Sequence, residues 1–354
     1  MKRRSFLKVA GSVAGGYLVC TGATLRAAAA GSTGKDEEVA ALPRRLVGRT
    51  GKKVSIVGFP GIALIHYDQK RCTGALHEAF DRGVNYFDVA PAYGNGDAEI
   101  KMGIGLQGID RSRIFLACKT KMRDREGARK ELERSLEWLK TGYFDLYQMH
   151  HIRTPQEVEQ ALGPDGAIQT FLKAKQEGKV RHFGLSAHTT KGALAALKGF
   201  RFDTIMFPIN FVEYFQMGFG KPILDLANKQ GVGVLAMKPI SGGAWPQDAQ
   251  RTRRYWYRPL EEAGDIDLAL RFALSQEPVA AGIPTGFLDL LDKTIPVGES
   301  YRPITESETQ KLKELAKTCH SLFRREEEQV ASGLPLNQPV YPNSPHECCP
   351  CVYV

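Results

Sequence analysis

Four side chains that can donate or accept protons lie at or near the ends of three consecutive apolar segments of the sequence. Asp88 and Tyr93 lie in NYFDVAPAYG, Lys119 ends IFLACK, and His150 ends DLYQMH. A phenol is a poor acid at neutral pH, because its pKa is about 10. A neighbouring ammonium lowers that pKa, and a buried ammonium needs a counter-ion. Tyr93 is therefore predicted to be a proton donor activated by Lys119, with Asp88 as counter-ion and His150 orienting a substrate oxygen.

Two of these residues have close competitors in the sequence. Lys121 lies two positions after Lys119, and His151 directly follows His150. Because successive strand residues point to opposite faces, His150 and His151 are not expected to point inward together.

The elements that must position these side chains alternate along the chain. After a hairpin-like segment, RRLVGRTGKKVS, come eight strand-like runs: SIVGFPGIAL, NYFDVAP, IFLACKTK, FDLYQMHH, VRHFGLSAH, FDTIMFPINF, GVGVLAMKPI and VAAGIPTG. Amphipathic helical stretches separate them. Eight strand–helix units predict a (β/α)8 TIM barrel with an N-terminal hairpin, in which reacting groups gather where the strands end. An open doubly wound sheet is the alternative.

Two other segments are interpreted from their context. ESETQKLKELAKTCHSLFRREEE predicts one last helix, which opens with a capping-box-like Thr305 and Glu308. GIGLQG, at residues 103–108, fits G-x-G-x-x-G but follows a helical stretch and precedes a strand. It is therefore interpreted as a helix end and not as a dinucleotide site.

Several of these motifs together resemble the aldo-keto reductases. NYFDVAPAYGNGDAE is similar to the family's D-T-A-x-x-Y-G-x-S-E signature, and IFLACK and DLYQMH resemble the strands that carry its lysine and histidine. The resemblance spans residues 43 to about 320 and selects Lys119 and His150 over their neighbours. It implies an NAD(P)H-dependent reductase of a small carbonyl compound or sugar, with Asp88, Tyr93, Lys119 and His150 as its catalytic residues.

The expected cofactor site departs from the family pattern. Ala187 stands where the resemblance implies an asparagine, Met206 stands in place of a glutamine, and no arginine for a 2′-phosphate follows the eighth strand. The cofactor is therefore left as NADP or NAD. The residues expected to bind it are Ser186, His188, Met237, Lys238, Ser241, Thr285 and Gly286.

The N-terminal residues resemble a twin-arginine export signal. Arg3 and Arg4 are followed by SFLK, an apolar stretch too short to span a membrane, and small residues suited to cleavage. The expected organisation is a Tat signal peptide at 1–30, a linker at 31–42, the barrel at 43–325 and an irregular tail at 326–354. We expect export to the periplasm by the Tat machinery, with the nucleotide already bound.

The net charge and the lack of long apolar runs limit the other function classes. The net charge is +9, but residues 1–30 hold five basic residues and no acid, so the remaining chain carries +4. This excess is too small to predict nucleic-acid binding. The basic, aromatic segment RTRRYWYR (Arg251–Arg258) has two interpretations: a loop that clamps phosphates or stacks on a sugar or base, or an ordinary solvated loop. No apolar run predicts a membrane span after processing.

The cysteines near the C-terminus are weak candidates for a metal or iron–sulfur site: Cys319, Cys348, Cys349 and Cys351. Their spacing matches no standard metal motif. Two alternatives to an enzyme remain: a redox-silent barrel that acts as a binding or regulatory subunit, and an electron-transfer protein that uses this tail.

Overall fold

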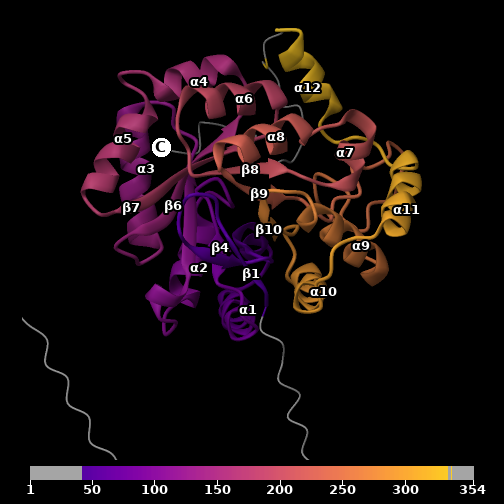
Figure 1. Ribbon diagram of the computed structural model, residues 1–354. Coiled ribbons are helices and arrows are strands. Elements are labelled where there is room, and N and C mark those ends of the chain that lie inside the picture. The colour runs from indigo at the N-terminus through magenta and orange to yellow at the C-terminus, as the bar shows by residue number, and fades with distance from the viewer. Residues whose placement is uncertain (1–41, 334–335, 337–354) are drawn as a thin grey trace, which may run out of the picture. The chain divides into compact units, whose positions relative to one another are not determined.

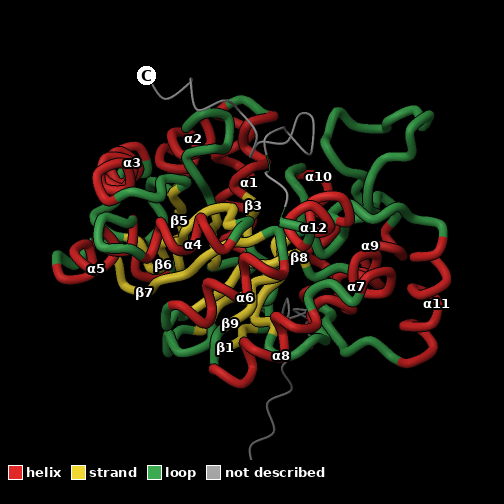
Figure 2. The backbone as a smooth tube through the Cα atoms, turned by 90° about the horizontal axis from the view of Figure 1, so that it is seen from above, coloured by secondary structure: helices red, strands yellow, loops and turns green. Residues whose placement is uncertain are grey.

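A closed barrel of parallel strands forms the centre of the molecule. The computed structural model describes residues 42–333 and residue 336. Eight strands follow the order β10-β9-β8-β7-β6-β5-β4-β3, and helices surround them in Figures 1 and 2. The sheet closes where Gly58 donates its N–H to Gly282 (3.0 Å) and Gly282 donates to Ile56 (2.8 Å). The predicted (β/α)8 barrel is confirmed, and the doubly wound alternative is wrong.

The strands are short and almost wholly buried. Their bounds are β3 (Phe59–Pro60), β4 (Tyr86–Asp88), β5 (Phe115–Thr120), β6 (Phe144–Ile152), β7 (Val180–Ala187), β8 (Thr204–Pro208), β9 (Gly233–Met237) and β10 (Val279–Ile283). Helices cover the outer face and side chains fill the inside, so continuous apolar runs, not alternating ones, encode these strands.

The predicted hairpin covers the N-terminal end of the barrel. Strand β1 (Arg44–Leu46) pairs antiparallel with β2 (Lys53–Ser55). Val47, in the turn, is fully buried in an apolar cluster with barrel residues. Gly48 has a φ of 48°, and a Cβ there would lie 2.2 Å from the backbone nitrogen of Gly233, so this close approach requires glycine. The opposite end of the barrel stays available for chemistry.

The connecting segments are mostly helical. The helices are η1 (Gly61–His66), α1 (Gln69–Asp81), α2 (Asp97–Gly105), η2 (Arg111–Arg113), α3 (Arg125–Trp138), α4 (Pro155–Leu162), α5 (Ala167–Gln176), α6 (Thr190–Gly199), α7 (Phe211–Met217), α8 (Lys221–Gln230), α9 (Ala263–Leu274), α10 (Leu288–Glu299), α11 (Glu306–Lys317) and α12 (Arg324–Ala331). The GIGLQG segment does end a helix, since α2 stops at Gly105. The capping box of Thr305 and Glu308 is also present.

The prediction of a single C-terminal helix is wrong. The segment is divided into α11 and α12, because the residues between them pair with other parts of the chain. Ala244 donates its backbone N–H to the carbonyl of His320 (2.8 Å), and Ser321 and Leu322 donate to the carboxylate of Glu213 (2.5 and 2.7 Å). These bonds replace the helical ones and turn the chain.

The start of the expected irregular tail is also corrected. Residues 326–331 belong to α12, and both Glu326 and Val330 are buried. The rest of the tail, with Cys348, Cys349 and Cys351, lies outside the described residues, as do the expected signal and linker at 1–41. Among the residues that are described, no helix is both long and apolar enough to cross a membrane.

Candidate active site

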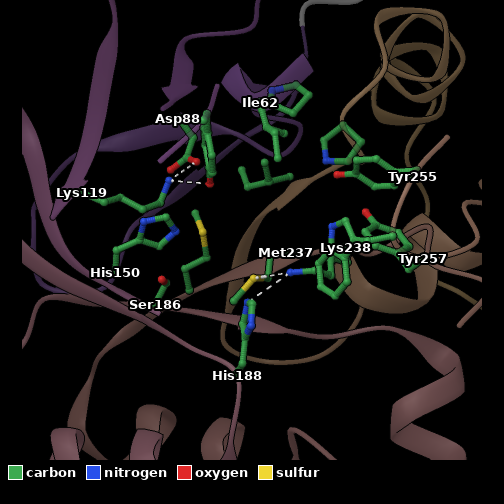
Figure 3. A pocket seen from close by; sticks show the side chains of 16 residues that line it. Ile62, Asp88, Lys119, His150, Ser186, His188, Met237, Lys238, Tyr255 and Tyr257 are labelled. Atoms are coloured by element: carbon green, nitrogen blue, oxygen red, sulfur yellow. Dashed lines mark hydrogen bonds and ion pairs between the residues drawn. The ribbon is translucent and has the colours of Figure 1, made fainter. Parts of the chain in front are cut away.

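The four predicted catalytic residues meet at the C-terminal end of the barrel (Figure 3). Lys119 is fully buried, and its Nζ donates to the Asp88 carboxylate, to the Val89 carbonyl (3.1 Å) and to the Tyr93 hydroxyl (3.2 Å). The ring of His150 meets the Tyr93 ring edge-on, with centroids 5.8 Å apart. Strands β4, β5 and β6 and the loop after β4 therefore bring together an acid, a cation, its counter-ion and an imidazole.

Burial and charge act in opposite directions on this group. Burial tends to lower the pKa of Lys119, but the charge of Asp88 and the hydrogen bonds to Asp88 and Tyr93 raise it, so Lys119 is an ammonium. Burial raises the pKa of Tyr93 to about 12, although Lys119 acts to lower it. Lys119 therefore acts on the Tyr93 pKa in the direction expected from the sequence, but burial outweighs its effect. Tyr93 is protonated, as a proton donor must be.

Both histidines at the end of β6 are buried, but only one of the two, His150, lines the cavity, as expected. His151 has a φ of 58°, and the pairing of β6 with β7 shifts register at this point. This irregularity breaks the strand alternation, so that His150 lines the cavity while His151 packs edge-on against His188, with ring centroids 4.4 Å apart. Lys121, the competitor of Lys119, is half-buried and does not line the cavity.

The residues expected to bind the cofactor fall into two groups. Ser186, His188, Met237 and Lys238 line the same cavity as Tyr93, whereas Ser241, Thr285 and Gly286 do not. Ser241 is fully buried, and its hydroxyl accepts from the Gly243 N–H (3.1 Å).

The segment Arg251–Arg258 covers the second group. The Tyr257 hydroxyl donates to Thr285 (2.8 Å), and a Cβ on Gly286 would lie 3.0 Å from the Tyr255 hydroxyl. Tyr255, Trp256 and Tyr257 are all buried, while Arg253 pairs with Asp289 and Glu261. The alternative of a solvated loop is wrong for these aromatic side chains, because they are buried, and Arg253 and Arg258 bind protein groups. The phosphate clamp stays a prediction.

A dinucleotide does not fit this conformation. The cavity has a volume of about 50 Å³, whereas pockets for drug-sized ligands measure about 300–1,000 Å³. Its lining includes residues that the sequence did not single out, among them Ile62, Tyr255, Trp256 and Tyr257. Their apolar and aromatic types carry no chemical signal, so only the fold could identify them. Aromatic side chains of Arg251–Arg258 form part of this lining, so the segment restricts the cavity in this conformation.

A second polar cluster adjoins the cavity. Lys238 lies 3.3 Å from Nε2 of His188 and 3.1 Å from the sulfur of Met237. Burial lowers the pKa of Lys238 to about 7, although the charge of Glu326 acts to raise it. The sequence analysis did not single out Glu326, which is one of three consecutive glutamates. Lys238 is therefore turned into the reactive cavity and not toward Thr285 and Gly286.

Among the described residues, three side chains of this cluster could together bind a metal ion. Potential ligand atoms of His151, His188 and Glu326 all lie within 4.8 Å of one another. The Lys238 nitrogen, however, already contacts His188, so we describe these three as the surroundings of Lys238. Cys319, a weak metal candidate, instead accepts a hydrogen bond from Arg258 (3.2 Å).

Known proteins share both the sequence pattern and the fold. Residues 66–320 match the model of the Aldo/keto reductase family. An L-galactose dehydrogenase from Arabidopsis thaliana is 30% identical over 215 residues, covering 56% of this chain and 66% of that protein. A 6-dehydroglucose reductase from Novosphingobium aromaticivorans is 31% identical over 201 residues, covering 49% of this chain and 61% of that protein.

The fold agrees with this assignment. An aldo-keto reductase from Bacillus halodurans, in its holo form, superposes with a TM-score of 0.65 at 24% identity, covering 79% of this chain and 98% of that chain. The chain spans just under two thirds of the length of the L-galactose dehydrogenase. The family model nevertheless matches most of the chain, and this protein belongs to the Aldo/keto reductase family.

Proposed function

We propose that this protein interconverts a small carbonyl compound and its alcohol, using NADP or NAD. One observation carries the proposal: the Tyr93 hydroxyl lies 3.2 Å from a fully buried ammonium, Lys119, that is neutralised by Asp88. An ion pair with no access to solvent contributes little to stability. The Lys119 ammonium of this pair is well suited to stabilise negative charge that appears on the Tyr93 phenol.

The chain's own residues account for the proton half of the reaction. Tyr93 is protonated because burial raises its pKa to about 12, so it donates its proton to the substrate oxygen when negative charge develops there. The phenolate left behind faces the Lys119 ammonium, which stabilises it. The His150 imidazole, packed against Tyr93, orients the same oxygen. The nicotinamide nucleotide, when bound, supplies the hydride.

We propose a sugar or a small sugar-like aldehyde as the substrate class. Two relatives are named for reactions of sugars, an L-galactose dehydrogenase and a 6-dehydroglucose reductase. The cavity lining supports this choice, because it combines aromatic side chains with hydroxyl and imidazole groups. Sugars bind to such mixtures through stacking on rings and hydrogen bonds to hydroxyls.

The hydride transfer can be tested directly with nucleotide labelled by deuterium at C4. The full-length protein is incubated with deuterated NADPH or NADH and a panel of aldoses, ketoses and short aldehydes. We expect one product alcohol to carry deuterium on the former carbonyl carbon. If the nucleotide binds and no carbonyl compound is reduced, the proposal is contradicted and the redox-silent barrel is supported. The aromatic side chains of Arg251–Arg258 that line the cavity favour this alternative.

We further propose that the protein is exported folded, through the twin-arginine pathway, with its nucleotide bound. The support is the sequence around Arg3 and Arg4. Nicotinamide nucleotides are cytoplasmic, so an exported reductase has to carry its own nucleotide and regenerate it with a second substrate.

A further inference from the structure

Two lysines line the cavity, and they have different partners. Lys119 forms an ion pair with Asp88. Lys238 forms no ion pair with any carboxylate of the described residues: its nitrogen lies 3.3 Å from the His188 ring and 3.1 Å from the Met237 sulfur. A buried lysine is normally paired, so the second arrangement needs an explanation.

The surroundings of Lys238 favour an uncharged amine. Its nitrogen lies 5.2 Å from the centroid of the Trp256 ring and 5.6 Å from that of Phe323, and the residue is only 7% exposed. Lys119 repels a second positive charge, whereas the carboxylate of Glu326 favours one. Burial outweighs Glu326 and lowers the pKa of Lys238 to about 7. Near neutral pH, Lys238 is therefore an uncharged amine in a large fraction of the protein molecules.

The backbone at Lys238 also turns the amine into the cavity. Lys238 directly follows β9 and has a φ of 57°, a conformation that non-glycine residues adopt rarely. In a regular strand, neighbouring side chains point to opposite faces. Here Met237 and Lys238 both line the cavity, as Figure 3 shows.

We propose that Lys238 is a nucleophile that forms a Schiff base with carbonyl compounds in this cavity. Desolvated lysines activated by a neighbouring cation are known to act in this way. This inference takes one thing from the proposed function: the class of ligand, which is a small aldehyde or ketone. It gives the cavity a second chemistry, covalent capture, alongside reduction.

The reaction balances without an oxidant or a reductant. The lone pair of the Lys238 nitrogen attacks the carbonyl carbon, a C–N bond forms, and the C=O π electrons move to oxygen. The oxygen then leaves as water with the two hydrogens of the amine, and a C=N bond remains. The His188 nitrogen, 3.3 Å from Nζ, is placed to carry these protons from nitrogen to oxygen.

The test traps the imine in the full-length protein without added nucleotide. Glycolaldehyde is small enough for the cavity, and cyanoborohydride reduces its imine to a stable secondary amine. Peptide mass spectrometry then compares labelling of Lys238 with labelling of exposed Lys229 on α8. We expect Lys238 to react at least about tenfold faster at neutral pH. Labelling of Lys238 no faster than that of Lys229 overturns the inference.

A matched pair of variants tests the assigned surroundings. Glu326→Gln removes the carboxylate that favours the ammonium, so the midpoint of Lys238 labelling should move to lower pH. Glu328→Gln removes a charge from the same helix, where the side chain is 70% exposed, and should leave the midpoint in place. Equal midpoints in the two variants contradict the role given to Glu326.

The outcome is separable from that of the proposed function. Tyr93→Phe should abolish nucleotide-dependent reduction and leave Lys238 labelling intact, because Tyr93 takes no part in forming the imine. Loss of Lys238 labelling with reduction still present overturns only the Schiff base.

Discussion

At the scale of single residues, the chemistry of the cavity depends on how each buried charge is compensated. Lys119 has a carboxylate partner and stays charged, whereas Lys238 has imidazole and thioether neighbours and gives up its proton easily. Burial therefore has opposite consequences for two identical side chains in one cavity. The first is suited to stabilising an anion and the second to attacking a carbonyl carbon.

This contrast predicts opposite effects of two substitutions on the free energy of unfolding. Lys119→Met leaves the Asp88 carboxylate buried without its cation and should destabilise the protein by about 3–5 kcal/mol. Lys238→Met removes a lysine that is costly to protonate when folded and should stabilise it by on the order of 1–3 kcal/mol at neutral pH. Urea denaturation of both variants measures the difference, and a destabilised Lys238→Met contradicts it.

The pH dependence gives an independent check. The pKa of Lys238 falls from 10.5 to about 7 on folding, so the unfolded chain binds the extra proton between these values. Stability of the wild type should therefore rise with pH across this range, relative to Lys238→Met. The advantage of the variant should shrink toward pH 10.5. An advantage that is constant with pH contradicts the assignment.

The positions of the catalytic residues could be predicted from the sequence, but their electrostatics could not. Asp88, Lys119 and His150 are recognisable because parallel strands all end at one rim of a barrel. The raised pKa of Tyr93 depends on how completely other segments cover it. The choice of His150 over His151 agrees with the cavity lining, but the positive φ of His151 and the register shift beside it could not be read from the sequence.

At the scale of elements, we propose that the segment Arg251–Arg258 controls the access of a nucleotide to the cavity, whose lining includes its three aromatic side chains. Backbone hydrogen bonds tie it to the turn after β9: Gly242 donates to Arg258 (2.8 Å), and Arg258 donates to Gly243 (2.9 Å). Arg253 fixes its outer part to Asp289 and Glu261. Nucleotide binding must compete with these contacts, so its measured affinity is reduced by the fraction of molecules that are closed.

Loosening this segment should therefore tighten nucleotide binding. Arg253→Ala removes the ion pairs that fix the outer part and should lower the Kd for NADPH or NADH severalfold. Arg254→Ala is the matched control, because Arg254 is exposed and forms no ion pair among the described residues, yet its loss changes the net charge equally. Fluorescence titration compares the two variants. An Arg253→Ala that binds no better than Arg254→Ala shows that the segment is no barrier.

The order of the elements could be read from the sequence, but the contacts that interrupt them could not. Periodicity gives the strand–helix alternation of the barrel because it depends only on neighbouring residues. The break between α11 and α12 arises from bonds to Glu213, about a hundred residues earlier in the chain. The closed position of Arg251–Arg258 depends in the same way on distant residues such as Thr285.

At the scale of the whole molecule, the proposed export and the barrel fold are connected. The nucleotide groove forms only in a folded barrel, so a protein that carries its nucleotide across a membrane must cross already folded. The segment Arg251–Arg258 would then keep the nucleotide from leaving once it has closed again.

Changing Arg3 and Arg4 to Lys should retain the protein in the cytoplasm with its activity intact. Cell fractionation gives the location, and denaturation followed by chromatography gives the nucleotide content. We expect the exported wild type to carry close to one nucleotide per chain. Exported protein that is empty and inactive without added nucleotide contradicts the retained nucleotide.

The central claim is that Tyr93 gives the proton that accompanies hydride transfer. The most direct measurement compares nucleotide-dependent turnover of the wild type and Tyr93→Phe on the same carbonyl substrate, together with the Kd for the nucleotide. The account predicts a loss in kcat of about 100-fold to 10,000-fold with nearly unchanged nucleotide affinity, because only the transition state loses a contact. A Tyr93→Phe variant that turns over at close to the wild-type rate would contradict it.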